Sequence, residues 1–223
     1  MSYNIKLGDA VSNILNISYG YVKAWSHRQW IIRTLNNPEQ WSLEIDYSHT
    51  KVLSDPRNNS AWNQRWFALH EGKVMIPSSS VNNDLPGITL EKAREETHYA
   101  LSGAKVDPYN ESPWRYLIGI VMEQWRCVQR RGDDMAKEEV ATLVRETIVA
   151  MKEMKQSLAE EHPTLGSCVS LLSALVDLLE LFTNERELLN EAKGYCDELI
   201  LEDPVRRKYW LKRGKVYEAL QVL

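Results

Sequence analysis

The chain has 223 residues, of which 43% are apolar and 26% are charged, so it can bury one sizeable core. Its formal net charge of −4 offers no basic field for a nucleic acid, and we expect no nucleic-acid function. The most apolar stretch, residues 171–182, is interrupted by two acids and is too short to cross a bilayer. We therefore expect no transmembrane segment.

Residues 1–23 fit no repeating pattern and lack the basic-then-apolar order of a signal peptide. We expect them to lie outside the main domain, and their composition leaves open whether they are helical or disordered. The three cysteines of the chain form no CxxC pair, so neither a disulfide framework nor a cysteine zinc site is indicated. A reducing, cytoplasmic location is the simpler interpretation.

One pattern recurs through the rest of the chain: a tryptophan that is followed, three residues later, by an arginine. The tryptophans are Trp25, Trp62, Trp114 and Trp210, and the arginines are Arg28, Arg65 and Arg213. Only the copy at Trp114 departs, with Leu117 in place of the arginine. An Asp-Pro pair stands seven residues ahead of three of these tryptophans.

The spacing of the copies predicts the fold. Trp25 and Trp62 stand 37 residues apart, which is the size of an αα-hairpin repeat. The longer gap after Trp114 has room for a worn copy, with His162-Pro163 in place of Asp-Pro and Val169 in place of Trp. We therefore expect an all-α fold, a right-handed superhelical array of antiparallel helical hairpins, with about five repeats over residues 24–223.

Helix starts are signalled at five places by residues that favour capping. The expected starts and caps are Asn37-Pro38, Ser60, Ser112-Pro113, Asp133-Asp134 and Asn184, the last in a capping box with Glu187. Residues near 72–88 have Pro, Ser, Asn and Gly without periodicity, and we expect an exposed loop inserted between the two helices of one unit. Residues 165–179 are apolar on most sides and predict a central, buried helix.

The recurring residues have a structural and a functional interpretation. A tryptophan at a fixed place in each hairpin is expected to fill the seam between consecutive helices. The arginine lies on the same helical face, and either hydrogen-bonds loop carbonyls of a neighbouring unit or points outward to a partner. The asparagines ahead of the tryptophans are expected to cap local backbone. The repeat and partner-interface candidates are Trp25, Arg28, Asn59, Trp62, Arg65, Asn110, Trp114, Trp210 and Arg213.

Read in full, these copies resemble the protein prenyltransferase α-subunit repeat, whose pattern is N-Y-x-x-W-x-x-R. The most specific string is RNNSAWNQR at residues 57–65, supported by AWSHRQW at 24–30, NESPW at 110–114 and RKYW at 207–210. The sequence of these segments is similar to that of the α subunit shared by the CaaX enzymes, farnesyltransferase and geranylgeranyltransferase type I. The resemblance runs from about residue 24 to 220 and is weakest over residues 135–183.

The resemblance implies a function in a heterodimer. In that family the α subunit wraps around a β subunit, which holds the catalytic zinc and most of the isoprenoid pocket. The enzyme transfers farnesyl or geranylgeranyl from its diphosphate to the cysteine of a C-terminal CaaX sequence. The farnesyl enzyme also uses magnesium. The implied partners of this chain are therefore the β subunit, CaaX proteins and an isoprenoid diphosphate. Neither a bound cofactor nor a catalytic residue is expected in the chain itself.

The sequence departs from the family pattern near residue 23. The family repeat N-Y-H-A-W has a His that approaches the diphosphate, and here the aligned residues 21–25 are Tyr-Val-Lys-Ala-Trp. Lys23 stands at the His position and can offer a cation to the diphosphate. No earlier repeat with the family's diphosphate-binding Lys precedes Trp25, so we expect N-terminal repeats to be missing. A non-enzymatic helical-repeat scaffold and an inactive truncated product remain as alternatives.

Overall fold

A computed structural model of the protein describes residues 22–72, 87–164 and 166–220, and describes side chains from Ala24 onward. The chain divides into two compact units, residues 1–81 and 82–223, and each is described by itself. All the regular elements in the described ranges are helices, and no strand occurs among them. The prediction of an all-α fold is confirmed.

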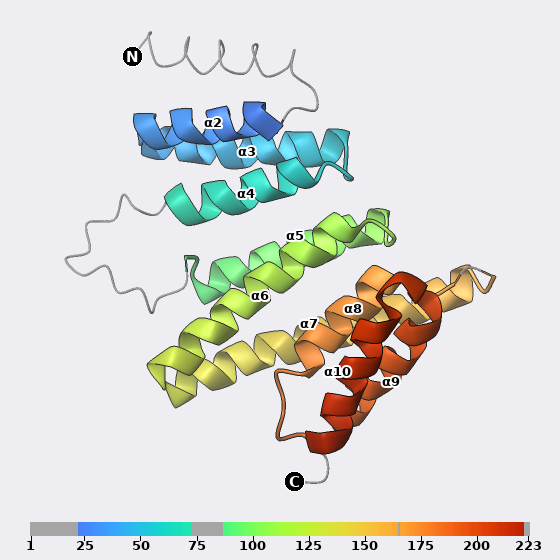
Figure 1. The fold of residues 1–223 in the computed structure, drawn as a ribbon. Helices are drawn as coiled ribbons and strands as arrows, with labels where there is room; N and C mark the ends of the chain where they lie inside the picture. The colour runs from blue at the N-terminus through green and yellow to red at the C-terminus, as the bar shows by residue number, and fades with distance from the viewer. Residues whose placement is uncertain (1–21, 73–86, 165, 221–223) are drawn as a thin grey trace. The chain divides into compact units, whose positions relative to one another are not determined.

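The first unit contains α2 (Val22–Leu35), α3 (Pro38–Ser54) and α4 (Asn59–Glu71) (Figure 1). The predicted start of α3 is confirmed, because the side chain of Asn37 accepts a hydrogen bond from the Glu39 N–H and Pro38 is the first helical residue. The α3–α4 hairpin packs against α2 around a small core of Ile32, Trp41, Phe67 and Ala68.

The second unit contains α5 (Leu90–Val106), α6 (Glu111–Arg131), α7 (Asp134–Glu161), α8 (Val169–Leu179), α9 (Arg186–Glu202), the short 3₁₀ helix η2 (Pro204–Arg206) and α10 (Arg207–Leu220). Its helices pair as the hairpins α5–α6, α7–α8 and α9–α10, and α8 also packs on α6 and α9 (Figure 1). Gly132 ends α6 with φ of 68°, a left-handed conformation that glycine adopts without strain. The predicted start of α7 at Asp133 is confirmed.

The hairpins share one register. The residues that cap the first helix of each hairpin are Asp55, Asp107, His162 and Asp203. His162 therefore does stand in the Asp position of a worn copy. Trp25, Trp62, Trp114 and Trp210 are each the fourth residue of their helix, as expected from the repeat. In α8 the fourth residue is the buried Leu172, whereas Val169 begins the helix, so the expected alignment of Val169 with Trp is wrong.

Three predicted caps are wrong. Asn58 and Asn110, not Ser60 and Ser112, cap α4 and α6, because their side chains accept hydrogen bonds from the first turn. Ser60 and Ser112 are the second residues of these helices. Before α9 the cap is Glu185 without a side-chain hydrogen bond, so Asn184 forms no capping box.

The buried helix predicted near residues 165–179 is confirmed as α8, which begins at Val169 and buries 8 of its 11 residues. The segment near 72–88 joins α4 to α5, and most of it, residues 73–86, lies outside the described residues. Because α3 pairs with α4 and α5 with α6, it connects two hairpins and is not inserted between the helices of one. The predicted boundary after residue 23 stays a prediction.

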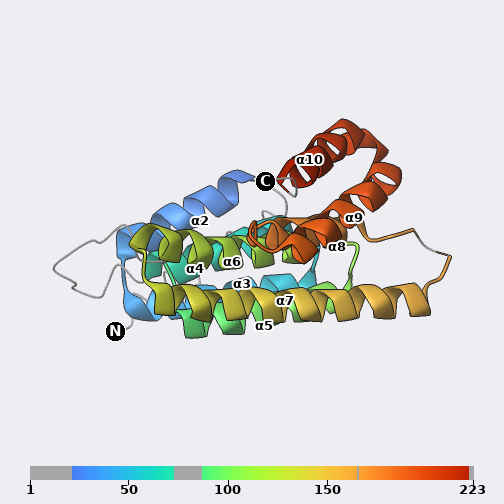
Figure 2. The ribbon, with the colours of Figure 1, turned by 90° about the horizontal axis from the view of Figure 1, so that it is seen from below.

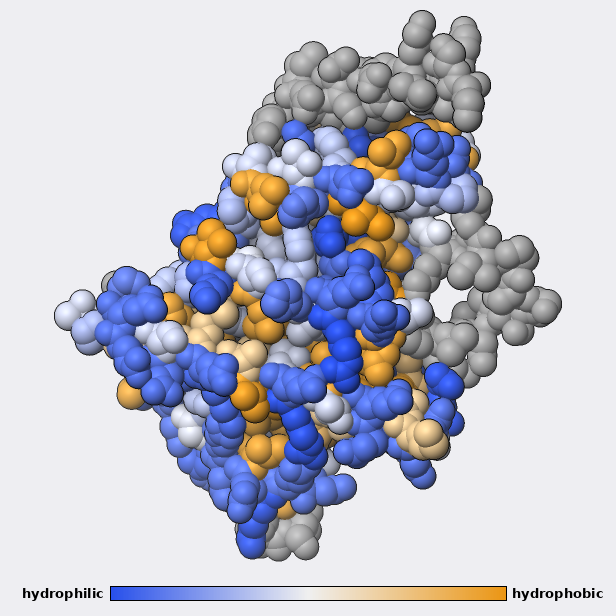
Figure 3. Space-filling view, turned by 180° about the vertical axis from the view of Figure 1, so that it is seen from behind, coloured by the Kyte–Doolittle hydropathy of each residue, from blue (hydrophilic) through white to orange (hydrophobic). Residues whose placement is uncertain are grey.

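The face shown in Figure 3 is largely covered by hydrophilic side chains, with narrower apolar areas between them. This agrees with helices that bury one face and expose a charged one. Among the described residues, none of the helices combines the length and the apolar character that spanning a membrane requires.

Candidate partner-binding site

The tryptophans of the complete hairpins are structural anchors. Trp62, Trp114 and Trp210 are each 1% exposed. The indole Nε1–H of Trp62 donates to the Pro56 carbonyl at 2.9 Å, and that of Trp114 donates to the Pro108 carbonyl at 2.8 Å. Each ring thus fills the hairpin and ties the helix start to the Asp-Pro turn ahead of it, which explains the fixed spacing in the sequence.

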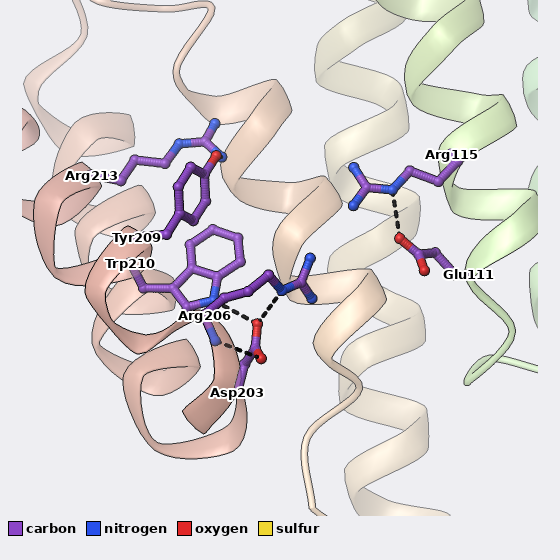
Figure 4. A network of polar contacts seen from close by, with 7 residues as sticks. All are labelled: Glu111, Arg115, Asp203, Arg206, Tyr209, Trp210 and Arg213. Atoms are coloured by element: carbon purple, nitrogen blue, oxygen red, sulfur yellow. Dashed lines mark hydrogen bonds and ion pairs between the residues drawn. The ribbon is translucent and has the colours of Figure 1, made fainter.

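Trp210 has a different acceptor. Its Nε1–H donates to Oδ2 of Asp203 at 2.8 Å, and the same oxygen accepts from Arg206 Nε (Figure 4). Burial of Asp203 works against its ionised form, but the hydrogen bonds from Trp210 and Arg206 outweigh this and lower the pKa of Asp203. The charged carboxylate therefore takes the place of the turn carbonyl in the last hairpin.

Arg28 is buried and its guanidinium forms a bidentate pair with Glu44 of α3, with both N···O distances 2.5 Å. Gln64 of α4 donates to the same carboxylate at 2.6 Å, and the guanidinium lies 3.6 Å from the ring centroid of Tyr47. Arg28 thus links α2 to the following hairpin through a carboxylate, whereas the two expected alternatives were loop carbonyls and an external partner.

The remaining candidates in the first unit are less informative. Arg65 is buried, and Asn59 is exposed as the first residue of α4. Trp25 is half-buried, with its ring 6.2 Å from that of Tyr47. Lys23 is the second residue of α2, but its side chain lies outside what the structure describes, so its role stays a prediction.

Arg213 lies at the centre of a polar network in the second unit. It pairs with Asp177 and Glu180 at the end of α8, both at 2.7 Å, and it donates to the hydroxyls of Tyr209 and Tyr217. Burial opposes the charge on Arg213, but the two carboxylates outweigh it and raise the pKa of the guanidinium. Burial raises the pKa of Asp177 even though Arg213 acts in the opposite direction. Arg213 therefore joins α10 to α8.

A shallow groove lies beside this network, lined by the first turns of α6, by α8 and by Arg206 of η2. Its polar lining comprises Glu111, Arg115, Ser170, Ser173, Asp177 and Arg206. Arg115 Nε is held by Glu111 at 2.8 Å and Arg206 Nε by Asp203 at 2.5 Å, and Figure 4 shows both guanidinium groups turned toward the space between them. Their terminal nitrogens can therefore donate hydrogen bonds to a bound molecule.

The charges that line this groove are balanced. Two carboxylates, Glu111 and Asp177, lie in the lining with the two guanidinium groups, so no excess of positive charge is available to a polyanion. Within the described ranges no three His, Cys, Asp or Glu side chains gather where an ion could bind. Burial raises the pKa of Cys196 to about 11, so this thiol is protonated and unreactive. Among the described residues, the groove thus presents hydrogen-bond donors and acceptors of both charges.

Sequence reasoning missed the carboxylates that the repeats use. Glu44 in α3 and Glu96 in α5 stand eleven residues before the caps Asp55 and Asp107, and both are buried. Glu44 accepts from Gln64, and Glu96 accepts from the Tyr116 hydroxyl at 2.7 Å. Gln64 and Tyr116 each stand two residues after the repeat tryptophan. The available signal was an acid within each apolar helical stripe, because buried acids require partners.

Comparison with known proteins agrees with this repeat geometry. The family described as "Protein prenyltransferase alpha subunit repeat" matches residues 41–71, which span the α3–α4 hairpin from Trp41 to the end of α4. The protein farnesyltransferase/geranylgeranyltransferase type-1 subunit alpha of Arabidopsis thaliana is 29% identical over 78% of this chain and 48% of its own length. Residues 41–71 therefore carry a protein prenyltransferase α-subunit repeat, and most of the chain is similar to α subunits of this kind.

Other relatives within the family extend this result. The corresponding subunit of Dictyostelium discoideum is 27% identical over 82% of this chain and 47% of its own length. The geranylgeranyl transferase type-2 subunit alpha of Saccharomyces cerevisiae is 24% identical over 84% of this chain and 54% of its own length. The chain thus spans about half the length of the curated relatives it matches.

A solved structure has the same fold. Candida albicans protein geranylgeranyltransferase-I, complexed with GGPP, superposes with a TM-score of 0.61 over 96% of this chain and 59% of that chain. The sequence identity is 20%, so this likeness establishes the helical-hairpin fold and no more. The sequence-based assignment to the prenyltransferase α-subunit repeat is confirmed.

Proposed function

We propose that this chain is the α subunit of a heterodimeric CaaX protein prenyltransferase. The observation that carries the proposal is the repeat itself: a buried tryptophan, tied to the turn ahead of it, recurs at the fourth position of α4, α6 and α10. The sequences of relatives named as α subunits of farnesyltransferase/geranylgeranyltransferase type-1 match this chain over most of its length. The reaction is transfer of farnesyl or geranylgeranyl from its diphosphate to a CaaX cysteine.

In this proposal the chain is not catalytic alone. The β subunit holds the zinc, which activates the cysteine sulfur when bound, and magnesium assists at the diphosphate in the farnesyl enzyme. The described residues supply docking contacts instead, and we assign Arg115 and Arg206 of the groove to contact with the β subunit. A cytoplasmic location is part of the proposal, supported by the three cysteines, which are all free and buried.

Co-expression tests the assembly. The chain is produced with the β subunit of farnesyltransferase, of geranylgeranyltransferase type I or of the type-2 enzyme, and each mixture is purified through a tag on this chain. We expect stoichiometric capture of a type-I or farnesyl β subunit, and prenyl transfer to a CaaX peptide by the complex but by neither chain alone. Capture of the type-2 β subunit alone would change the substrate class. Capture of none would favour the non-enzymatic scaffold.

The groove variant Arg115→Glu/Arg206→Glu is expected to lose capture by at least tenfold, because two donors become acceptors. Lys105→Glu/Arg126→Glu is the matched control, since both cations are exposed and line no part of the groove. Circular dichroism of both variants checks that the helices are retained. Equal capture by the two variants would remove the groove from the interface while leaving the subunit assignment intact.

Lys23 is tested in the same complex by single-turnover transfer to a CaaX peptide. If Lys23 contacts the leaving diphosphate, Lys23→Ala lowers the rate by about 10²-fold, as for other preorganised contacts to a developing anion. Lys105→Ala is the control with an equal loss of charge. A rate unchanged by Lys23→Ala shows that this lysine lies outside the diphosphate site.

A further inference from the structure

The last helix, α10, carries a row of lysines on its exposed face. Its buried residues are Trp210, Gly214 and Tyr217. Lys208, Lys212 and Lys215 repeat the spacing of these residues two positions away, which places them about 200° around the helix, on the opposite face. We call these three lysines the α10 basic row.

The α10 basic row has no counter-charge of its own. None of its lysines makes an ion pair with a described residue, and neither does the adjacent Arg207. Two other cations at this end of the chain are paired: Arg206 with Asp203, and Arg213 with Asp177 and Glu180. Like charges four residues apart on a helix repel each other, so an external anion stabilises this surface. The whole chain has a formal charge of −4, so the row is a local feature.

The long helix α7 carries a complementary row of acids. Glu139, Glu146, Glu153 and Glu160 are all exposed and stand seven residues apart. The helix buries the face that contains Val140, Val144, Thr147 and Met151, so the acids form a row on its outer side. Glu146 is paired with Arg94, whereas Glu139, Glu153 and Glu160 make no ion pair with a described residue. We call these four residues the α7 acidic row.

The two rows cannot neutralise each other within one molecule. Both helices belong to the second unit, and Figure 2 shows α7 and α10 along opposite sides of it. The exposed face of each row is therefore available to a second molecule.

The spacing of the two rows matches. Lys208 and Lys215 are seven residues apart, as are Glu153 and Glu160, so each pair spans about 10 Å along its helix. Exposed apolar side chains flank both rows: Leu211 and Val216 on α10, and Met135 and Val149 on α7. Two helices laid side by side could thus pair charges at a seven-residue repeat and bury these apolar side chains.

We propose that the α10 basic row of one copy of this chain docks on the α7 acidic row of a second copy. The contact joins two different surfaces, so it is head-to-tail and leaves a free row at each end of the assembly. Exposed charges supply most of the attraction, and salt therefore weakens it. This self-association is independent of the proposed prenyltransferase function.

Sedimentation velocity of the full chain tests the proposal over a concentration series, at about 50 mM and about 500 mM salt. We expect concentration-dependent association at low salt and at least a tenfold weaker Kd at high salt. Lys208→Glu/Lys215→Glu and Glu153→Lys/Glu160→Lys are each expected to remain monomeric at low salt. Lys105→Glu/Arg126→Glu, with the same change in net charge as the first variant, is expected to associate like the unaltered chain.

Mixing supplies the decisive measurement. The first variant carries acids on both helices and the second carries lysines on both, so an equimolar mixture should form heterodimers where neither variant self-associates. A mixture that stays monomeric, an unaltered chain that stays monomeric at low salt, or a control that loses association as the α10 variant does would each overturn the proposal.

Discussion

Arg28 and Arg213 occupy the same position in the repeat, three residues after a tryptophan, but they bind carboxylates in opposite directions along the chain. Arg28 in α2 reaches forward to Glu44 in α3, whereas Arg213 in α10 reaches back to Asp177 and Glu180 at the end of α8. The side chain of Glu44 is 1% exposed, and those of Asp177 and Glu180 are 19% and 38% exposed. One sequence motif therefore supports two different contacts.

The difference shows what the motif specifies. A tryptophan and an arginine three residues apart lie on the same helical face, so the ring and the guanidinium both face the helices that pack against it. Which neighbour supplies the acid depends on the helix that packs there. The burial of that acid then sets how much the ion pair contributes to stability. Water screens an exposed pair, whereas the groups of a buried pair have no water to replace a lost partner.

Removal of Glu44 is expected to have the largest effect. Glu44→Ala leaves the buried guanidinium of Arg28 without an anion and the amide of Gln64 without its acceptor, so the free energy of unfolding should fall by about 3–5 kcal/mol. Urea unfolding followed by circular dichroism measures it. Glu71→Ala, which removes the exposed partner of Arg33, should change stability by about 0–1 kcal/mol. Similar losses in the two variants would contradict the comparison.

Removal of Arg213 should have a smaller effect. Arg213→Met keeps the apolar stem of the side chain but takes the cation from Asp177 and Glu180, with an expected loss of about 2 kcal/mol at neutral pH. Burial already raises the pKa of Asp177, and loss of Arg213 raises it further. Protonation then relieves the unpaired charge, so the loss should shrink as pH falls. A loss independent of pH would show that packing, not charge, is responsible.

One matched pair of variants distinguishes the tryptophan that donates to a carboxylate from those that donate to a backbone carbonyl. Trp210→Phe and Trp114→Phe remove the same atoms from buried sites, but the first takes one of its donors from a carboxylate and the second takes a donor from a carbonyl. Hydrogen bonds to charged groups are the stronger, so we expect Trp210→Phe to be more destabilising by about 1 kcal/mol. Chemical denaturation at neutral pH measures both. A larger loss at Trp114 would assign the energy to packing.

The carboxylate anchor also predicts a pH dependence. The pKa of Asp203 is lowered in the folded chain, so its stabilisation is present above the ordinary Asp value of about 3.9 and is lost as pH falls through the folded pKa. The stability gap between the unaltered chain and Asp203→Asn should therefore narrow on acidification. For Asp177→Asn the trend should reverse, because the pKa of Asp177 is raised. Unfolding measured from about pH 6 to pH 3 tests both signs.

Much of the fold could be predicted from local patterns. The distance from Asp-Pro to Trp is short, and the same few residues make the turn, the helix start and the anchor, as at Asp107, Pro108 and Trp114. The caps were harder to predict, because Asn and Ser both suit a cap and two residues separate Asn110 from Ser112. Only the backbone conformation decides which side chain meets the N–H of the first turn.

The candidate site could not be predicted in this way. Its groove brings Arg115 on α6 together with Asp177 on α8 and Arg206 in η2, residues that are far apart in sequence and lie in no common motif. An exposed arginine near a helix start looks the same in a sequence whether it faces solvent or a groove. The way in which α6, α8 and η2 come together around the groove decides the difference.

The sequence alone determined the repeat, the helical class and the place of each tryptophan, because these depend on spacing within one hairpin. The tertiary structure decided which carboxylate each arginine binds and how deeply the pair is buried. A guanidinium reaches whichever acid packing brings within about 3 Å. For Arg28 that acid is 16 residues ahead, and for Arg213 the acids Glu180 and Asp177 come earlier in the chain, on another hairpin. Contacts of this range follow from the packing of whole helices, which no local pattern specifies.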